Sequence, residues 1–361
     1  IEGVLKMQWG DLITLEYGKP IKDKESVDGP IPVYGTNGQI GTSHLKPLCE
    51  HPSFILGRKG AYRGVHYSDT PFSVIDTAFY AQPISDKVDL KWAYYKFLTY
   101  DINRMDSGSA IPSTDRYEIY SINVDLPDLA TQRKVVSVLE LLDNKIQDNI
   151  KINDNLQQQI RLLYNYWFTQ FDFPVSFDQT DGKMPADWRE GTLGEIATIT
   201  SGKRPPMKQP TATTEVSIPL VGAASIMGFT NAVLYNEPIL VTGRVGTHGV
   251  VQRYQSPCWT SDNTLVIKSE FYEYAFQALQ RVDYVNMNRG STQPLITQTD
   301  LKNVSIVIPT EAILLEYEKI AGTLMAMYES NRKENERLAV LRNTLLPRLM
   351  NGEIDVSNIE I

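Results

Sequence analysis

The sequence has few of the residues and segments that mark several common classes of protein. Its 361 residues include 2 cysteines and 4 histidines, so neither a disulfide framework nor a zinc cluster is expected, as fits a reducing cytoplasm. No apolar run approaches the ~20 residues that a membrane-spanning helix needs, and residues 1–10 lack the apolar segment of a signal peptide. We therefore expect a cytoplasmic protein that does not cross a membrane.

An excess of positive charge is also missing. The formal net charge is −8, which argues against a protein that holds nucleic acid by bulk electrostatics. Counting Asp, Glu, Lys and Arg gives −4 for residues 1–128, −2 for 129–187, +1 for 188–310 and −3 for 311–361. By itself, a chain with this charge should attract nucleic-acid phosphates only weakly.

Catalytic motifs are scarce. The chain has no Asn-Pro-Pro-Tyr or Asp-Pro-Pro-Tyr run of a methyltransferase and no Walker A loop, and its histidines lack metal-ligand spacing. Pro127-Asp128 followed by Asp143-Asn144-Lys145 fits the written form of a nuclease motif. That chemistry needs its Asp and Lys on adjacent strands, whereas Asp143 to Lys145 fall in a predicted helix. A DNA-binding chain with its own nuclease or methyltransferase activity is thus the alternative to a non-catalytic DNA-reading subunit.

What the chain does contain is a heptad pattern, in which core positions recur at alternating intervals of four and three residues. In residues 129–168 these positions are Val135, Leu139, Leu142, Ile146, Asn149, Asn153, Leu156, Ile160 and Leu163. Near the C-terminus they are Ile320, Leu324, Met327, Asn331, Glu334, Leu338, Leu341 and Leu345. Both series turn polar near the middle, which favours either a fixed register between two paired helices or a surface for another subunit.

The chain also repeats itself along its length. The matched segments are residues 10–19 with 194–203, 31–35 with 218–222, 57–60 with 243–246, 108–112 with 290–294, and 122–127 with 304–309. Each half then enters its heptad helix. The fold class predicted from this order is α+β, with two repeated α/β globules joined by two long antiparallel helices in a coiled coil and an approximate two-fold symmetry.

The predicted segments follow from the repeat. The globules are residues 1–128 and 188–309, the helices are 129–170 and 310–350, the linker is 171–187 and the tail is 351–361. Short β-like runs cover residues 53–56 and 239–242, and amphipathic helices are expected at 90–99 and 270–281.

This order of motifs resembles one family, the specificity (S) subunits of type I restriction-modification systems. The likeness rests on residues 31–38, 57–60, 76–80, 108–112 and 127–134 in the first half, and on 243–246, 290–294 and 346–354 in the second. The resemblance implies that each globule is a target-recognition domain reading one half of a bipartite, asymmetric site in double-stranded DNA. The helices would space the globules and dock two methylation (M) subunits, with restriction (R) subunits joining outside. No cofactor would bind this chain, because S-adenosylmethionine for adenine methylation, ATP and Mg²⁺ would belong to the partners.

Candidate DNA contacts lie around two glycine loops, residues 57–64 and 243–249. These loops could cradle phosphates or form tight turns that present Arg58 or Arg244 to DNA. Reading base edges needs polar side chains on exposed loops. In the first globule the candidates are Tyr34, Asn37, Arg58, Lys59, Arg63, His66, Arg104 and Arg116. In the second they are Lys203, Arg204, Lys208, Arg244, Thr247, His248, Arg253, Asn288, Arg289 and Gln293. No catalytic or metal-ligating residue is predicted.

Overall fold

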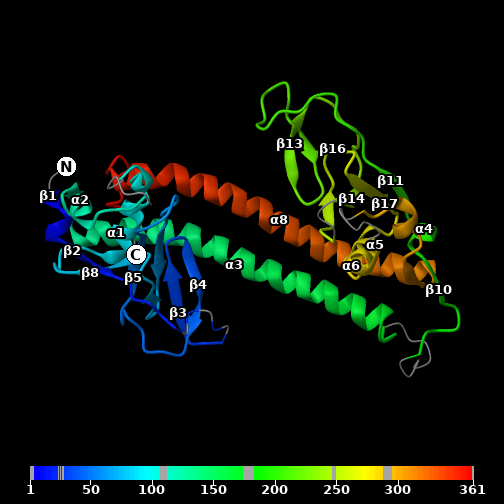
Figure 1. Ribbon diagram of the computed structural model, residues 1–361, viewed down its shortest axis with the longest axis horizontal. Helices are drawn as coiled ribbons and strands as arrows, with labels where there is room; N and C mark the ends of the chain where they lie inside the picture. Colours follow the sequence, from blue (N-terminus) through cyan, green and yellow to red (C-terminus); the bar gives the residue numbers. More distant parts are fainter. Residues whose placement is uncertain are drawn as a thin grey trace. The chain divides into compact units, whose positions relative to one another are not determined.

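The computed structural model describes residues 4–22, 24, 26, 28–105, 112–173, 183–245, 249–287 and 295–359. It divides into two compact units (Figure 1). The first unit is Ile1–Asn149 with Lys333–Ile361, and the second is Ile150–Arg332. Each unit therefore combines one globule with a part of both long helices. No helix within the described residues is long and apolar enough to span a membrane.

The first globule is built from three small sheets. A four-stranded antiparallel sheet has the order β2 (Ile13–Tyr17), β8 (Ala78–Pro83), β5 (Ser53–Gly57) and β6 (Val65–Ser68). A three-stranded sheet has the order β4 (Gly38–Ser43), β3 (Ile31–Gly35) and β7 (Ser73–Val74), with β3 and β7 parallel. The third pairs β1 (Leu5–Gln8) with β9 (Asn123–Leu126).

The second globule repeats the same three sheets. Its four-stranded sheet has the order β11 (Thr198–Ser201), β17 (Thr264–Lys268), β14 (Ile239–Gly243) and β15 (Gln252–Tyr254). Its three-stranded sheet is β13 (Ile226–Thr230), β12 (Ile218–Val221) and β16 (Trp259–Thr260), and β10 (Arg189–Thr192) pairs with β18 (Ser305–Ile308). The predicted internal repeat and the α+β fold class are confirmed, since every strand of one globule has a counterpart in the other.

Two glycines show why the repeat preserves particular residues. Gly18 and Gly202 each follow the first strand of the four-stranded sheet, and their N–H groups donate to Ala78 O and Thr264 O. A Cβ on Gly18 would lie 2.0 Å from the Ile75 carbonyl oxygen, and one on Gly202 would lie 2.1 Å from that of Ser261. No larger residue fits where the backbones come this close.

Short helices close the core of each globule. In the first they are η1 (Trp9–Asp11), α1 (Leu90–Phe97), η2 (Ile102–Arg104) and α2 (Arg116–Tyr120). In the second they are α4 (Leu193–Ile196), α5 (Tyr272–Leu279), α6 (Tyr284–Met287) and α7 (Gln298–Lys302). α1 starts where Asp89 accepts hydrogen bonds from the N–H groups of Lys91 and Trp92. It buries Trp92 and Phe97 in the main core of the first unit.

The two long helices, α3 (Leu129–Phe168) and α8 (Glu311–Met350), pack against each other in both units. In the first unit Val135 and Leu139 of α3 share a core with Leu346 and Leu349 of α8. In the second unit the late part of α3 shares a core with the early part of α8, through residues that include Ile160 and Tyr317. Because early α3 meets late α8 and late α3 meets early α8, the pairing is antiparallel, as predicted.

The predicted core positions of the heptad pattern, called the seam below, match the buried residues closely on α3 but not on α8. The α3 positions are buried or half-buried along their whole length, including Asn149 and Asn153. On α8, however, Met327 is 50% exposed and Leu341 is 45% exposed. The least exposed line instead runs through Tyr317, Ala321, Leu324, Tyr328, Asn331, Asn335, Leu338, Arg342 and Leu345. The prediction of Met327 and Leu341 as core positions of α8 is therefore wrong. The heptad pattern selected these apolar residues, whereas their neighbours Tyr328 and Arg342 are the less exposed side chains.

The polar positions in the middle of the seam bond to one another. In the first unit Asn149 Nδ2 donates to Glu334 Oε2 at 2.7 Å and to Asn335 Oδ1 at 2.8 Å. In the second unit Asn331 Nδ2 donates to Asn153 Oδ1 at 2.9 Å. Matched buried amides stabilise one register of the two helices, because sliding either helix would leave them unpaired.

Candidate nucleic-acid interface

In each globule three segments meet at one place: the end of β2 or β11, the loop after β5 or β14, and the start of α2 or α7. Arg58 N–H donates to Thr77 O at 2.9 Å, and Arg58 O accepts from Thr114 N–H at 2.9 Å. In the second globule Arg244 N–H donates to Asn263 O at 2.8 Å, and Arg244 O accepts from Ile296 N–H at 3.0 Å. Arg58 and Arg244 therefore occupy equivalent positions.

The first glycine loop is a tight turn rather than a phosphate cradle. Gly57 N–H donates to Gly64 O at 2.8 Å, Gly64 N–H to Thr36 O at 3.0 Å, and Gly60 N–H to Pro112 O at 3.0 Å. Since these backbone donors are already bonded within the globule, they are not available to a phosphate. Of the two interpretations left open by the sequence, the structure favours a turn that presents side chains.

A group of two half-buried arginines and two exposed tyrosines surrounds that turn in the first globule. The Arg58 Cζ lies 4.7 Å from the centre of the Tyr17 ring, and the Arg116 Cζ lies 4.9 Å from it. Arg116 also lies 5.1 Å from the Tyr117 ring and donates to Tyr117 Oη at 3.2 Å, which raises the pKa of the guanidinium. We call Tyr17, Arg58, Arg116 and Tyr117 the Tyr17 cluster. Sequence reasoning missed both tyrosines, because it searched the glycine loops and not the strand end beside them.

The Tyr17 cluster presents charge to solvent. Tyr17 is 42% exposed and Tyr117 is 64% exposed. Within the described residues neither Arg58 nor Arg116 forms an ion pair, although Arg58 Nη1 donates to Asp76 O at 3.2 Å. Arg58 and Arg116 are themselves half-buried. Guanidiniums at the surface without acidic partners suit a DNA-facing site.

The second globule has different side chains at the equivalent place. Ser201 stands where the first globule has Tyr17, and Gln298 where it has Arg116. Gln298 Nε2 donates to Ser201 Oγ at 2.9 Å. Arg244 is half-buried beside them. The exposed Lys203, Arg204 and Lys208 follow β11.

Several other candidates in the first globule have roles within the fold. Arg63 is only 2% exposed, and both its N–H and Nη2 donate to Asn103. Arg104 forms an exposed ion pair with Asp101 at 2.9 Å. Tyr34 packs edge-on against Phe72, and burial lowers the pKa of His66, which keeps its ring neutral. We therefore remove the buried Arg63 from the predicted interface. The exposed Arg104, the exposed Asn37 at the β3–β4 turn and the half-buried Lys59 remain predictions.

In the second globule Arg253 is corrected in the same way. Its guanidinium donates to both carboxylate oxygens of Glu273 at 2.5 Å, and both side chains are nearly buried. It also stacks on Phe276, with its Cζ 4.6 Å from the ring centre. Such a paired, desolvated arginine is a core element of the globule. The candidates Thr247, His248, Asn288, Arg289 and Gln293 lie outside the described residues.

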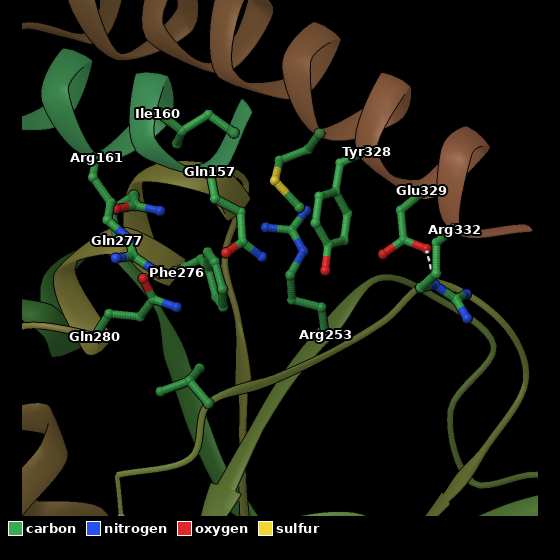
Figure 2. A pocket seen from close by; sticks show the side chains of 12 residues that line it. Gln157, Ile160, Arg161, Arg253, Phe276, Gln277, Gln280, Tyr328, Glu329 and Arg332 are labelled. Atoms are coloured by element: carbon green, nitrogen blue, oxygen red, sulfur yellow. Dashed lines mark hydrogen bonds and ion pairs between the residues drawn. The ribbon is translucent and has the colours of Figure 1, made fainter. Parts of the chain in front are cut away.

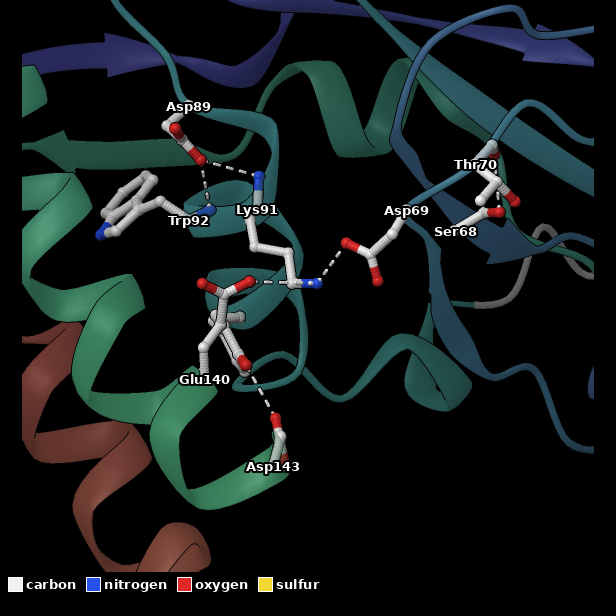
Figure 3. A network of polar contacts seen from close by, with 9 residues as sticks. Ser68, Asp69, Thr70, Asp89, Lys91, Trp92, Glu140 and Asp143 are labelled. Atoms are coloured by element: carbon white, nitrogen blue, oxygen red, sulfur yellow. Dashed lines mark hydrogen bonds and ion pairs between the residues drawn. The ribbon is translucent and has the colours of Figure 1, made fainter. Parts of the chain in front are cut away.

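Arg253 points into a cavity of about 290 Å³ in the second unit (Figure 2). The cavity is lined from α3, α5 and α8 by side chains that include Arg161, Gln277 and Tyr328. In the first unit the corner between α1 and α3 holds a polar network, in which Lys91 Nζ lies 2.9 Å from Asp69 and 3.4 Å from Glu140 (Figure 3).

The residues of the nuclease-like pattern have structural partners. Asp128 accepts from Thr131 N–H at 2.7 Å and so caps α3. Asp143 accepts from Tyr95 Oη at 2.7 Å and from Arg342 Nη1 at 2.8 Å. Lys145 Nζ lies 3.5 Å from Glu334. Among the residues that the structure describes, no group of three or more His, Cys, Asp or Glu could hold a metal ion.

Comparison with known proteins decides the family. The model of the type I restriction modification DNA specificity domain matches the chain twice, over residues 2–158 and 185–343. The chain belongs to this family. The specificity subunit of the type I restriction enzyme MjaIX from Methanocaldococcus jannaschii is 23% identical over 308 residues, covering 76% of this chain and 71% of the relative. The HindI specificity subunit from Haemophilus influenzae is 22% identical over 320 residues, covering 65% and 70%.

A solved structure shows the same fold. The S subunit of the type I restriction-modification system from M. genitalium matches with a TM-score of 0.69 at 17% sequence identity, covering 96% of each chain. The resemblance predicted from the sequence is confirmed. This chain is a DNA specificity subunit of a type I restriction-modification system, which is the non-catalytic component of these enzymes.

Proposed function

We propose that residues 1–128 and 188–309 are two target-recognition domains, and that each reads one half of a bipartite, asymmetric site in double-stranded DNA. The observation that carries this proposal is the double match of the specificity-domain model, one match for each globule. The equivalent placement of Arg58 and Arg244 supports it, because the same turn offers an arginine in both globules. The different neighbours of these arginines suit an asymmetric target.

The helices space the two domains and dock two methylation subunits in this proposal. Exposed apolar side chains on the helices support the docking role, since contiguous apolar surface on a soluble protein marks interaction sites. In the first unit they are Val340 and Leu341 on α8 and Leu141 on α3. In the second unit they are Ile150, Ile152, Leu162 and Tyr166 on α3 and Leu315 and Met327 on α8.

In this proposal the partner subunits catalyse methylation and cleavage, in the cytoplasm. The methylation subunits bring S-adenosylmethionine for adenine methylation, and restriction subunits bring ATP and Mg²⁺. The structural roles of Asp128, Asp143 and Lys145 support this assignment over a nuclease within the chain. Incubating the pure chain with DNA and Mg²⁺, or with a labelled methyl donor, should yield neither cleavage nor methylation.

Domain exchange tests the reading of half-sites. Replacing residues 188–309 by the matching segment of a relative, in a complex with its methylation subunits, should change one half of the methylated target. The other half should stay the same, because each globule has its own core. Mapping methylated adenines in the host genome measures both halves, and a hybrid in which both half-sites change contradicts the proposal.

A paired insertion tests the spacing role. Seven residues added after Asn149 in α3, with seven added between Asn331 and Glu334 in α8, keep the buried stripes in register and lengthen each helix by ~10.5 Å at ~1.5 Å per residue. At ~3.4 Å per base pair, the gap between half-sites should grow by about three base pairs. Inserting five residues instead should turn the buried faces of α3 and α8 away from each other and abolish assembly of the complex. An unchanged gap in an active complex would show that the helices do not set the spacing.

A further inference from the structure

The Tyr17 cluster occurs in one globule only, although the backbone around it is common to both. Tyr17 and Ser201 each end the first strand of the four-stranded sheet, and Arg116 and Gln298 each begin the helix after the glycine turn. Two guanidiniums approach one tyrosine ring in the first globule, at 4.7 and 4.9 Å. In the second, a serine and a glutamine bond to each other instead. The difference lies in side chains, so it affects recognition without altering the fold.

Contact with an aromatic ring fixes the direction of an arginine. A guanidinium over the ring keeps its plane oriented and its charge in place, while its N–H donors stay at the rim. Arg58 Nη1 is further tied to Asp76 O at 3.2 Å. Among the residues that the structure describes, its Nε and Nη2 have no acceptor and form a fork of two donors. A fork of this kind matches the O6 and N7 acceptors of guanine in the major groove.

We propose that Arg58 reads a guanine in the half-site of the first globule, and that Tyr17 is the positioning residue that orients it. The proposal rests on the proposed function, because it assumes that this globule reads one half-site. Arg116 places a second guanidinium 4.9 Å from the centre of the same ring. The second globule lacks the tyrosine, so Arg244 there is not held in this way.

Substitutions at Arg58 separate base reading from phosphate contact. Lys keeps the charge but lacks the planar fork. In the full complex with its methylation subunits, Arg58→Lys should reduce discrimination at one G·C pair of the first half-site by roughly tenfold to a hundredfold. The second half-site should not change. Arg58→Gln should have the same effect on discrimination, together with weaker binding overall.

Substitutions at Tyr17 test the positioning role. Tyr17→Phe retains the ring and should preserve the first half-site, whereas Tyr17→Ser, which copies the second globule, should relax the same G·C pair as Arg58→Lys. Lys46→Gln removes one positive charge from the same globule, where Lys46 pairs with Glu50 at 2.8 Å. This control should leave both half-sites unchanged. Thermal unfolding of each variant shows whether the globule is intact.

Methylated sites mapped at single-base resolution give the readout, and domain exchange identifies which half belongs to the first globule. A first half-site without any G·C pair overturns the inference. So does an Arg58→Lys variant that retains full discrimination, because that result indicates a phosphate contact. If Arg58→Lys fails to fold, equal specificity of Tyr17→Ser and Tyr17→Phe overturns it instead. A wild-type complex that methylates no bipartite site would instead contradict the proposed function.

Discussion

In the first unit a shared carboxylate joins the short helix α1 to both long helices, whereas in the second unit aromatic rings join α5 to them. Tyr95 Oη of α1 donates to Asp143 of α3, which also accepts from Arg342 of α8. In the second unit Tyr274 of α5 stacks on Tyr164 at 5.4 Å and meets Phe168 edge-on at 4.7 Å. One topology is thus held by two kinds of chemistry, which shows that the repeat preserves the position of this helix and not the contacts that fix it.

The carboxylates at this junction differ as well. In the second unit Glu318 of α8 accepts from the N–H groups of Glu273 and Tyr274, at 3.0 and 2.8 Å, and so caps the start of α5. Burial raises the pKa of Glu318 to about 7. In the first unit the side-chain oxygen of Gln132, a neutral group, accepts from Asp89 N–H at 2.8 Å. The N–H groups of Lys91 and Trp92, which correspond to those of Glu273 and Tyr274, donate to Asp89. The capping carboxylate therefore comes from a long helix in the second unit and from the N-cap of α1 itself in the first.

The largest effect is expected from breaking the aromatic junction. Phe168→Ala removes a ring that contacts Trp188, Tyr274 and Tyr317, and should cost about 3–5 kcal/mol of the stability of the second unit. Urea unfolding of the full chain measures the loss. Leu141→Ala, at an exposed position of α3, should change stability by less than about 0.5 kcal/mol. A similar effect of both substitutions would show that the rings do not hold the junction.

The polar junction should respond less strongly. Asp143→Ala leaves the buried Tyr95 hydroxyl and Arg342 without their acceptor and should cost about 1–3 kcal/mol. Adding Tyr95→Phe removes the unpaired donor, so the double variant should recover part of this loss. The exposed Asp86→Ala is the control. A double variant that is less stable than the sum of the single changes would contradict the hydrogen-bond account.

The smallest effect is a dependence of stability on pH. Since the pKa of Glu318 is raised from 4.5 to about 7 on folding, the stability linked to its protonated form is present below pH 4.5 and lost as the pH rises through 7. Glu318→Gln removes the titration, although its amide oxygen can accept from only one of the two N–H groups. Between pH 5 and pH 8 the variant should therefore lose about 1–2 kcal/mol less stability than wild type. Unfolding at both pH values checks this, with the exposed Glu316→Gln expected to follow wild type.

Local patterns were sufficient to predict most of the fold. The heptad intervals predict α3 and α8, because a helix repeats its faces at nearly the same spacing. The glycines at 18 and 202 mark the repeat, because neighbouring backbones exclude any side chain there. The paired polar residues Asn149 and Asn153 indicate a fixed register, which the buried amide contacts are consistent with.

The candidate interface was harder to predict. A sequence shows which residues can contact DNA but not which are exposed. Arg63 and Arg253 have the right chemistry, but Arg63 is buried and Arg253 is nearly buried, whereas Tyr17 lies on a strand end that no motif marked. The cluster forms because β2, the glycine turn and α2 converge, and these segments are far apart in the chain.

The sequence alone determined the periodicity, the repeat and the family, since each depends on residue order within a segment or between equal segments. Tertiary structure decided which face of α8 is buried, which arginines face solvent and what differs between the two globules. On α8 the paired face carries Tyr328, Asn335 and Arg342 rather than Met327 and Leu341. The physical reason is that Asn335 and Arg342 on that face are stabilised by partners on the opposite helix, and those partners are set by packing and not by the local pattern.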